Sequence, residues 1–215
     1  MSDDQLLKQA VLDELEWEPS VNSAHIGVTA KDGIVTLTGH VGNYAEKAAA
    51  EKAARRVNDV KGVAEEIEVR LPFDVKHGDE EIAAAAVAHL NWNSTVPSGA
   101  VKVKVENGWV TLTGQVAWRY KAEAALRVIR PLWGVLGVSN SITVKLQPNV
   151  SAIREKILVA LNRSWLDPAT INVTAQGGRV TLAGEVNSWS EREEAGDAAW
   201  AAPGTTNVEN NISII

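Results

Sequence analysis

A seven-residue phrase occurs three times in this chain. It reads GIVTLTG at residues 33–39, GWVTLTG at 108–114 and GRVTLAG at 178–184. A shared Gly-x-Val-Thr-Leu-x-Gly pattern at intervals of 70 to 75 residues indicates three copies of one small domain. The copies are expected to be joined by short linkers. The predicted domains span residues 1–72, 76–147 and 149–215.

Each phrase is preceded by a tryptophan that ends a segment of helical apolar periodicity. These tryptophans are Trp17, Trp92 and Trp165. Because they recur in register, we interpret them as core or hinge packing. The glycines of the phrase are interpreted as structural, marking a hairpin turn and a strand end. They are Gly33, Gly39, Gly108, Gly114, Gly178 and Gly184.

The first copy indicates five elements. A helical apolar stripe begins at Asp3 and stops before Pro19. Alternating and β-branched residues then predict strands over 25–30 and 34–39, joined by an Asp-Gly turn. An alanine-rich segment with Glu–Lys pairs, AEKAAAEKAARR, predicts a helix over 43–57. A third strand follows over 63–71.

This order defines the fold class as α+β, with three tandem αββαβ domains. A hairpin followed by a β-α-β crossover requires a mixed three-stranded sheet. Both helices are expected on one face of that sheet. Trp189 aligns with Tyr44 at the start of the second helix of its copy, which suggests an aromatic staple there.

Charge is unevenly distributed along the chain, whose net charge is -6. Residues 1–72 carry 8 basic and 13 acidic side chains, residues 73–148 carry 8 and 6, and residues 149–215 carry 5 and 8. Only the middle copy is therefore net positive. The acidic total argues against a nucleic-acid partner, because such binding depends on neutralising phosphates.

Targeting signals are not evident in the sequence. No apolar run approaches the roughly 20 residues of a membrane-spanning helix, and the start MSDDQLLKQAVLDELEW is acidic and amphipathic. We therefore expect a cytoplasmic protein, or a periplasmic or membrane-associated one if a leader has been removed. The chain has no cysteine, which excludes disulfides and thiolate chemistry.

No catalytic constellation is visible. The glycine phrase lacks the lysine and Ser/Thr of a phosphate-binding loop. The histidines are not spaced as metal ligands, and the acidic groups do not match a calcium loop. We therefore expect no enzyme activity, no metal site and no cofactor.

The turn between helix and strand in the middle copy is unusual. It reads RPLWGVLG at 130–137, where the first copy has the polar VNDVKG at 57–62. Exposed apolar clusters mark contact surfaces. Three uses remain open: packing against a sister domain, self-association, and contact with lipid or a small ligand. The candidate contact residues are Trp133, Leu132, Leu136, Arg130, Arg127, Lys121, Trp109 and Trp118.

The repeat resembles the BON domain, a module of bacterial osmotically induced and nodulation-related proteins. The resemblance lies in the helix end at Glu14–Trp17, the glycine phrase, the alanine-rich helix and the final strand GVSNSITV at 137–144. It covers nearly the whole chain three times. Two positions depart from the pattern: Glu65 replaces a strand asparagine, and Asn207 replaces the glycine before the last strand.

The resemblance implies a non-enzymatic protein associated with phospholipid interfaces, osmotic stress and transport. Three functional hypotheses follow. The first is binding to a phospholipid or membrane surface. The second is a homo-oligomer that forms a pore or scaffold for small solutes. The third is a cytoplasmic sensor of a small ligand or cation.

Overall fold

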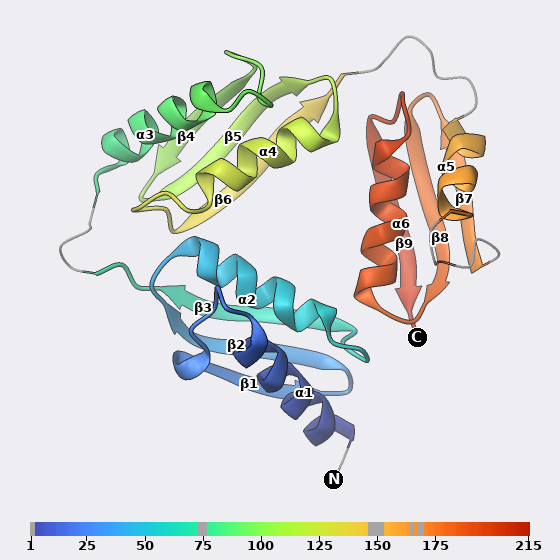
Figure 1. Ribbon diagram of the computed structural model, residues 1–215, viewed down its shortest axis with the longest axis horizontal. Coiled ribbons are helices and arrows are strands. Elements are labelled where there is room, and N and C mark those ends of the chain that lie inside the picture. The colour runs from blue at the N-terminus through green and yellow to red at the C-terminus, as the bar shows by residue number, and fades with distance from the viewer. Residues whose placement is uncertain (1–2, 73–76, 146–152, 164–165, 167–169) are drawn as a thin grey trace.

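The structure is a computed structural model that describes residues 3–72, 77–145, 153–163, 166 and 170–215. It contains three three-stranded mixed sheets, each accompanied by two helices (Figure 1). The predicted fold class is therefore confirmed.

The elements repeat in one order. Domain 1 comprises α1 (Asp3–Trp17), a 3₁₀ turn (Ser23–His25), β1 (Ile26–Lys31), β2 (Ile34–Val41), α2 (Tyr44–Arg56) and β3 (Gly62–Val69). Domain 2 comprises α3 (Asp79–Trp92), β4 (Val101–Glu106), β5 (Trp109–Val116), α4 (Arg119–Ile129) and β6 (Gly137–Val144). Domain 3 comprises α5 (Ile153–Leu161), β7 (Ile171–Gln176), β8 (Arg179–Val186), α6 (Trp189–Ala201) and β9 (Asn207–Ile214).

The strand carrying the glycine phrase lies at the centre of each sheet. It runs antiparallel to the strand before it and parallel to the strand that follows the second helix. The register is the same in every copy, so that Leu37, Leu112 and Leu182 each face a valine of the preceding strand. A shared register places equivalent residues of the three domains in equivalent positions.

Backbone geometry explains both glycines of the phrase. The first follows a residue that already has positive φ, as in Asp32 (52°) and Gly33 (81°), which is the conformation of a tight hairpin turn. The second, such as Gly114 (φ 140°), has no room for a side chain, because a Cβ would collide with the carbonyl oxygen of Ala100. The phrase therefore folds the hairpin and does not form a nucleotide loop.

Each domain has its own core between the helices and one face of its sheet. In domain 1 the stripe Leu7, Val11 and Leu15 is buried against Val35 and Leu37. Spacings of four residues put these side chains on one side of α1. Equivalent stripes in α3 and α5 bury the cores of domains 2 and 3.

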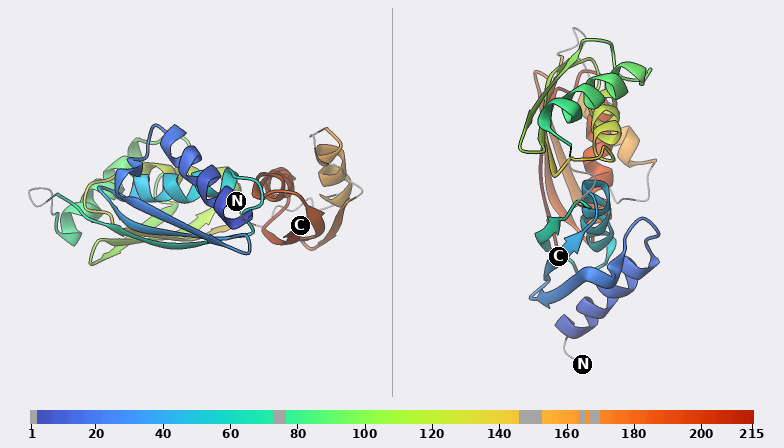
Figure 2. Two further views of the ribbon diagram at one scale, coloured as in Figure 1. Left: turned by 90° about the horizontal axis from the view of Figure 1, so that it is seen from below. Right: turned by 90° about the vertical axis from the view of Figure 1, so that its left-hand side faces the viewer.

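The opposite face of each sheet is open and polar. The right-hand view of Figure 2 shows the helices on one side of the molecule and the sheets on the other. Residues such as Thr38, Thr113 and Ser141 occupy the open faces, where they alternate with the buried residues of the same strands.

The second helices of the three domains, α2, α4 and α6, lie on the inside of the molecule (Figure 1). α2 contacts α6 directly. Tyr44, the first residue of α2, packs against the core of domain 2, and Trp189, the first residue of α6, packs against the core of domain 1. The predicted staple within each domain is therefore wrong for these two side chains, because they join domains.

Candidate functional site

The apolar turn of domain 2 packs against the hairpin turn of the same domain. The amide of Leu136 donates a hydrogen bond of 2.9 Å to the carbonyl oxygen of Gly108. A Cβ on Gly108 would meet the carbonyl oxygen of Gly134 and the side chain of Leu136. The two turns thus form one end of the domain.

Trp109 extends this end onto the open face of the sheet. Its six-membered ring occupies the space that a side chain on Gly137 would need. Its indole Nε1 donates a hydrogen bond of 2.8 Å to Ser139 Oγ. The ring is held at two points and is still 51% exposed.

Two further apolar side chains at this end reach solvent: Trp133 is 56% exposed and Leu136 is 37% exposed. We call Trp109, Trp133 and Leu136 the tryptophan surface. The other apolar residues of the turn face inward, since Leu132 packs against the core of domain 2 and Val135 is fully buried. Leu132 therefore packs into the domain and is a poor candidate for direct contact with a partner.

Arg127 and Arg130 lie in the last turn of α4 and at its C-cap, just before the apolar turn in sequence. Both are exposed, and neither forms an ion pair with another described residue. The segment that leads into the apolar turn therefore carries two exposed cations.

Two of the sequence-derived candidates, Trp118 and Lys121, lie elsewhere. Trp118 is the N-cap of α4 and Lys121 is in its first turn. At 1.5 Å per residue, Lys121 is about 12 Å along the helix from Ile129. These two side chains belong to the end of α4 that meets domain 3, where Arg119 stacks at 4.9 Å over the ring of Trp200.

One alternative for the apolar turn was burial against a sister domain. The exposure of Trp133 is not consistent with such burial for this side chain. Self-association and contact with lipid or a small ligand remain as predictions for the tryptophan surface.

The three repeats match one known family of protein domains. The profile of the BON domain matches residues 3–70, 78–145 and 149–215. The chain belongs to the BON domain family. Each of its three BON domains carries one copy of the glycine phrase.

The chain is similar to the osmotically-inducible protein Y of Escherichia coli (strain K12). It is 29% identical to this chain over 150 residues, which are 66% of this chain and 73% of the relative.

Two solved structures of CdsD, a structural protein of the type III secretion system of Chlamydia trachomatis, also align with the chain. The first is 15% identical, with a TM-score of 0.28, over 96% of this chain and 91% of the other. The second, its C-terminal domain, is 16% identical, with a TM-score of 0.27, over 100% and 99%. Similarity at this level carries no argument about this protein.

Two of the recurrent tryptophans, Trp17 and Trp92, are not core residues. Trp17 is 83% exposed and Trp92 is 90% exposed, so the prediction of core or hinge packing is wrong for both. Each follows the last buried leucine of its helix by two residues, or about 200° around the helix axis. That rotation points the side chain away from the core. Trp165 lies outside the described residues.

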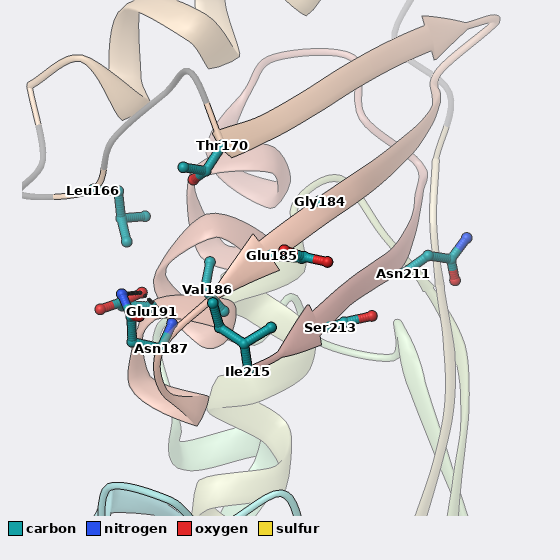
Figure 3. A pocket seen from close by; sticks show the side chains of 10 residues that line it. All are labelled: Leu166, Thr170, Gly184, Glu185, Val186, Asn187, Glu191, Asn211, Ser213 and Ile215. Carbon is teal, nitrogen blue, oxygen red and sulfur yellow. Dashed lines mark hydrogen bonds between the residues drawn. The ribbon is translucent and has the colours of Figure 1, made fainter.

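A pocket lies at the C-terminal end of the central strand in BON domain 3. Its polar lining includes Glu185, Asn187, Glu191 and Asn211. Figure 3 shows Glu191 turned back onto Asn187, whose amide donates a hydrogen bond of 2.8 Å to it. Glu46 accepts the equivalent bond from Gly42 in BON domain 1. These carboxylates thus hold helix starts and are not available as free ligands.

The imidazoles of His25 and His40 lie together in BON domain 1, with ring centroids 4.7 Å apart. A third ligand is lacking, because the described residues contain no group of three or more His, Cys, Asp or Glu side chains placed to hold a metal ion. Nor is any helix in the described part of the chain long and apolar enough to cross a membrane.

Proposed function

We propose that this protein is a non-enzymatic, stress-associated binding protein that associates reversibly with anionic phospholipid surfaces. The tryptophan surface of BON domain 2 would make the contact. The observation that carries the proposal is the exposure of Trp109 and Trp133 in the domain whose apolar turn follows Arg127 and Arg130, two exposed arginines with no ion pair among the described residues. The name of the osmotically inducible relative supports the association with stress.

Physical chemistry favours this partner for such a surface. Tryptophan rings prefer the interface between lipid headgroups and acyl chains. Each Lys or Arg near an anionic membrane contributes about 1 kcal/mol. Two arginines and two exposed indoles are enough for reversible association only. Domains 1 and 3, which are net negative, would be repelled by the same surface.

Vesicle co-sedimentation tests the proposal. The protein should sediment with vesicles of phosphatidylglycerol and phosphatidylcholine, and less with phosphatidylcholine alone. Binding should weaken as salt rises from about 0.05 to about 0.5 M, because the arginines are screened. Trp133→Ala should reduce the bound fraction several-fold.

Trp92→Ala is the matched control, because it removes an even more exposed indole from the same domain. Its binding should equal that of the wild type. Equal losses in both variants would contradict a specific surface, and absence of binding to anionic vesicles would refute the lipid proposal.

Self-association is a second candidate that the same exposed apolar side chains favour. Light scattering after size exclusion gives the mass of the wild type and of Trp133→Ala. An oligomer that falls to the 23.1 kDa protomer in the variant would assign the surface to assembly. A wild-type monomer would exclude assembly at that concentration.

A further inference from the structure

The open face of the sheet in BON domain 2 differs in charge from the equivalent faces of the sister domains. Lys102 and Lys104 of β4 are exposed on this face, because they alternate with valines that pack against the core. The shared register places glycine and threonine at these two positions in domain 1, and asparagine and threonine in domain 3. The two lysines are therefore particular to the middle domain.

The strand at the other edge of the sheet differs in the same direction. Glu66 and Glu68 of β3 lie on the open face of domain 1, and β6 has Ser141 and Thr143 at the same register positions. All four side chains are exposed. Domain 3 has an exposed carboxylate on its last strand, Glu209. An anionic partner would thus meet hydroxyl groups on domain 2 where the sister faces present carboxylates.

The strands of domain 2 place one carboxylate on this face. It belongs to Glu106, which pairs with Lys104 at 2.8 Å while both side chains stay exposed. Lys102 has no ion pair within the described part of the chain. Counted over its three strands, the face carries two lysines against one glutamate, whereas each sister face carries two glutamates against one basic residue. Only the domain 2 face is therefore net positive.

Polar side chains form two regular rows across this face. The register aligns Lys104, Thr111 and Ser139 in one row, and Lys102, Thr113 and Ser141 in the next. Each row joins an ammonium group to two hydroxyls over about 10 Å, since neighbouring strands lie about 4.8 Å apart. The two rows are separated by about 6.7 Å along the strands. We call these six residues, together with Trp109, the lysine face.

Trp109 adds an aromatic ring beside the rows. The six-membered ring covers Gly137, and Nε1 donates a hydrogen bond of 2.8 Å to Ser139 Oγ. Because Gly137 and Ser139 are two residues apart on β6, these contacts hold the indole along the surface of the sheet. The ring remains 51% exposed. The equivalent positions in the sister domains hold Ile34 and Arg179, so this fixed ring is also particular to domain 2.

These three kinds of group match the chemistry of an acidic sugar chain. A pyranose ring presents a face of C–H groups that can stack on an indole. Its hydroxyls exchange hydrogen bonds with serine and threonine, which both donate and accept. Its carboxylates accept charge-assisted hydrogen bonds from lysine.

Other classes of partner fit the lysine face less well. A lipid surface favours several inserted apolar side chains, and Trp109 is the only apolar side chain on this face. Single-stranded nucleic acid binds to basic domains that stack successive bases on several aromatic rings, whereas this chain has a net charge of -6 and one such ring here. An extended peptide pairs with the edge of a sheet rather than with its face.

We propose that the lysine face of BON domain 2 binds an acidic polysaccharide. Trp109 stacks on one sugar ring, the hydroxyl rows bind the neighbouring sugars, and Lys102 and Lys104 bind carboxylates. Lys102 contributes more than Lys104, because Lys104 is already paired with Glu106. This activity goes beyond the proposed binding to phospholipid. It shares Trp109 with the tryptophan surface but does not use Trp133, which lies in the turn and not on a strand.

Nuclear magnetic resonance tests binding to each sheet separately. The probe is tetragalacturonate, a linear oligosaccharide with a carboxylate on every sugar, titrated without lipid. The indole N–H signal of Trp109, assigned by its loss in Trp109→Phe, should shift and saturate together with the amides of β4, β5 and β6. Amides of the strands in domains 1 and 3 should not shift, so the sister sheets are internal controls. Maltotetraose, which has the same length and no charge, should bind far more weakly.

Two variants of the lysine face and two controls define the site. Trp109→Ala should weaken binding by about two- to ten-fold, the range expected for loss of one aromatic contact. Lys102→Ala should weaken it by about two- to five-fold at low salt, as expected for an exposed charge pair. Lys31→Ala removes an exposed lysine from the first strand of domain 1, and Trp133→Ala removes an exposed indole from the turn. Both controls should bind as tightly as the wild type.

Three results would overturn the proposal. The first is the absence of any saturable shift in β4, β5 and β6 with tetragalacturonate. The second is equal binding of maltotetraose, which would leave the lysines without a role. The third is tighter binding of a single-stranded oligonucleotide with four phosphates, which would assign the face to nucleic acid. Trp133→Ala should reduce vesicle binding but not these shifts, so the lipid and polysaccharide proposals can fail separately.

Discussion

At the scale of single residues, the most informative side chains are two tryptophans that the fold does not need. Trp17 and Trp92 end their helices at equivalent positions but point into solvent. The buried neighbours Leu15 and Leu90 fill the cores at this end of the helices. An exposed indole at the same position in two domains indicates that neither core needs this side chain.

Stability measurements test whether the fold needs these two indoles. Trp17→Ala and Trp92→Ala should each change the free energy of unfolding by less than about 0.5 kcal/mol, because the side chains are exposed. Leu15→Ala should cost about 2–5 kcal/mol, because it leaves a cavity in the core of domain 1. Urea denaturation followed by circular dichroism gives both values. A loss of more than about 1 kcal/mol for either tryptophan variant would mean that the indole packs more closely than its exposure indicates.

The sequence contained the signal that would have predicted this exposure. The stripe Leu7, Val11 and Leu15 fixes the inward direction of α1, and Trp17 does not lie on it. Recurrence of a large apolar residue in three copies is equally compatible with a core and with a shared contact. Only the helical phase distinguishes the two.

At the scale of elements, an ionic cluster ties the end of α1 to the end of α2. Arg56 Nη2 lies 2.8 Å from Glu14 and 2.9 Å from Glu18. Hydrogen bonds from Ser20, and then from Arg56, lower the pKa of Glu18 to about 2. The folded state therefore favours the ionised carboxylate, and its contribution to stability is present above the ordinary pKa of 4.5.

This contribution should be lost as pH falls from about 4.5 towards 2, because protonation of Glu18 removes its bonds to Ser20 and Arg56. Glu18→Gln should lower the melting temperature at pH 7, and its difference from the wild type should disappear near pH 2. Differential scanning fluorimetry between pH 2 and 7 measures this difference. Glu16→Gln, which removes an exposed carboxylate with no ion pair among the described residues, should show no such convergence.

Element order and topology could be predicted because each signal lies within one copy. The predicted helix over 43–57 corresponds to α2 at Tyr44–Arg56, and the Asp-Gly turn is where the sequence places it. The first strand was expected from His25, but Ser23–His25 forms a 3₁₀ turn capped by the side chain of Asn22. A local side-chain cap of this kind competes with strand pairing and leaves little trace in hydrophobic periodicity.

The candidate site was less predictable from the sequence. The turn at 130–136 was recognised by its apolar composition, but the sequence could not show that Leu132 and Val135 face inward while Trp133 and Leu136 face outward. Lys121 and Trp118 are close to this turn in sequence and are separated from it by the length of α4. Side-chain direction in an irregular turn depends on backbone contacts, here with Gly108, that no periodic pattern records.

At the scale of the whole molecule, the contacts between domains could not be predicted from the repeated sequence pattern. A pattern shared by three copies identifies what each domain does for itself, whereas Tyr44, Arg119 and Trp189 differ at one aligned position. The difference reflects three different neighbours in the assembled chain. Positions that vary between copies are thus informative about assembly.

The position of Tyr44 leads to a prediction about stability across a domain boundary. Tyr44 starts α2 in domain 1, but its ring packs against the core of domain 2. Tyr44→Ala should therefore destabilise domain 2 by about 1–2 kcal/mol, the value expected when a partly buried side chain is lost. Hydrogen exchange followed by mass spectrometry should show faster exchange in β5 and α4, with little change in β1 and β2.

Tyr120→Ala is the matched control, because Tyr120 is the only other tyrosine in the chain and is exposed. It should leave exchange in domain 2 unchanged, although it lies within that domain. Faster exchange confined to domain 1 in Tyr44→Ala would contradict the docked arrangement of domains 1 and 2. Faster exchange in domain 2 would show that the first two domains share stability through the ring of Tyr44.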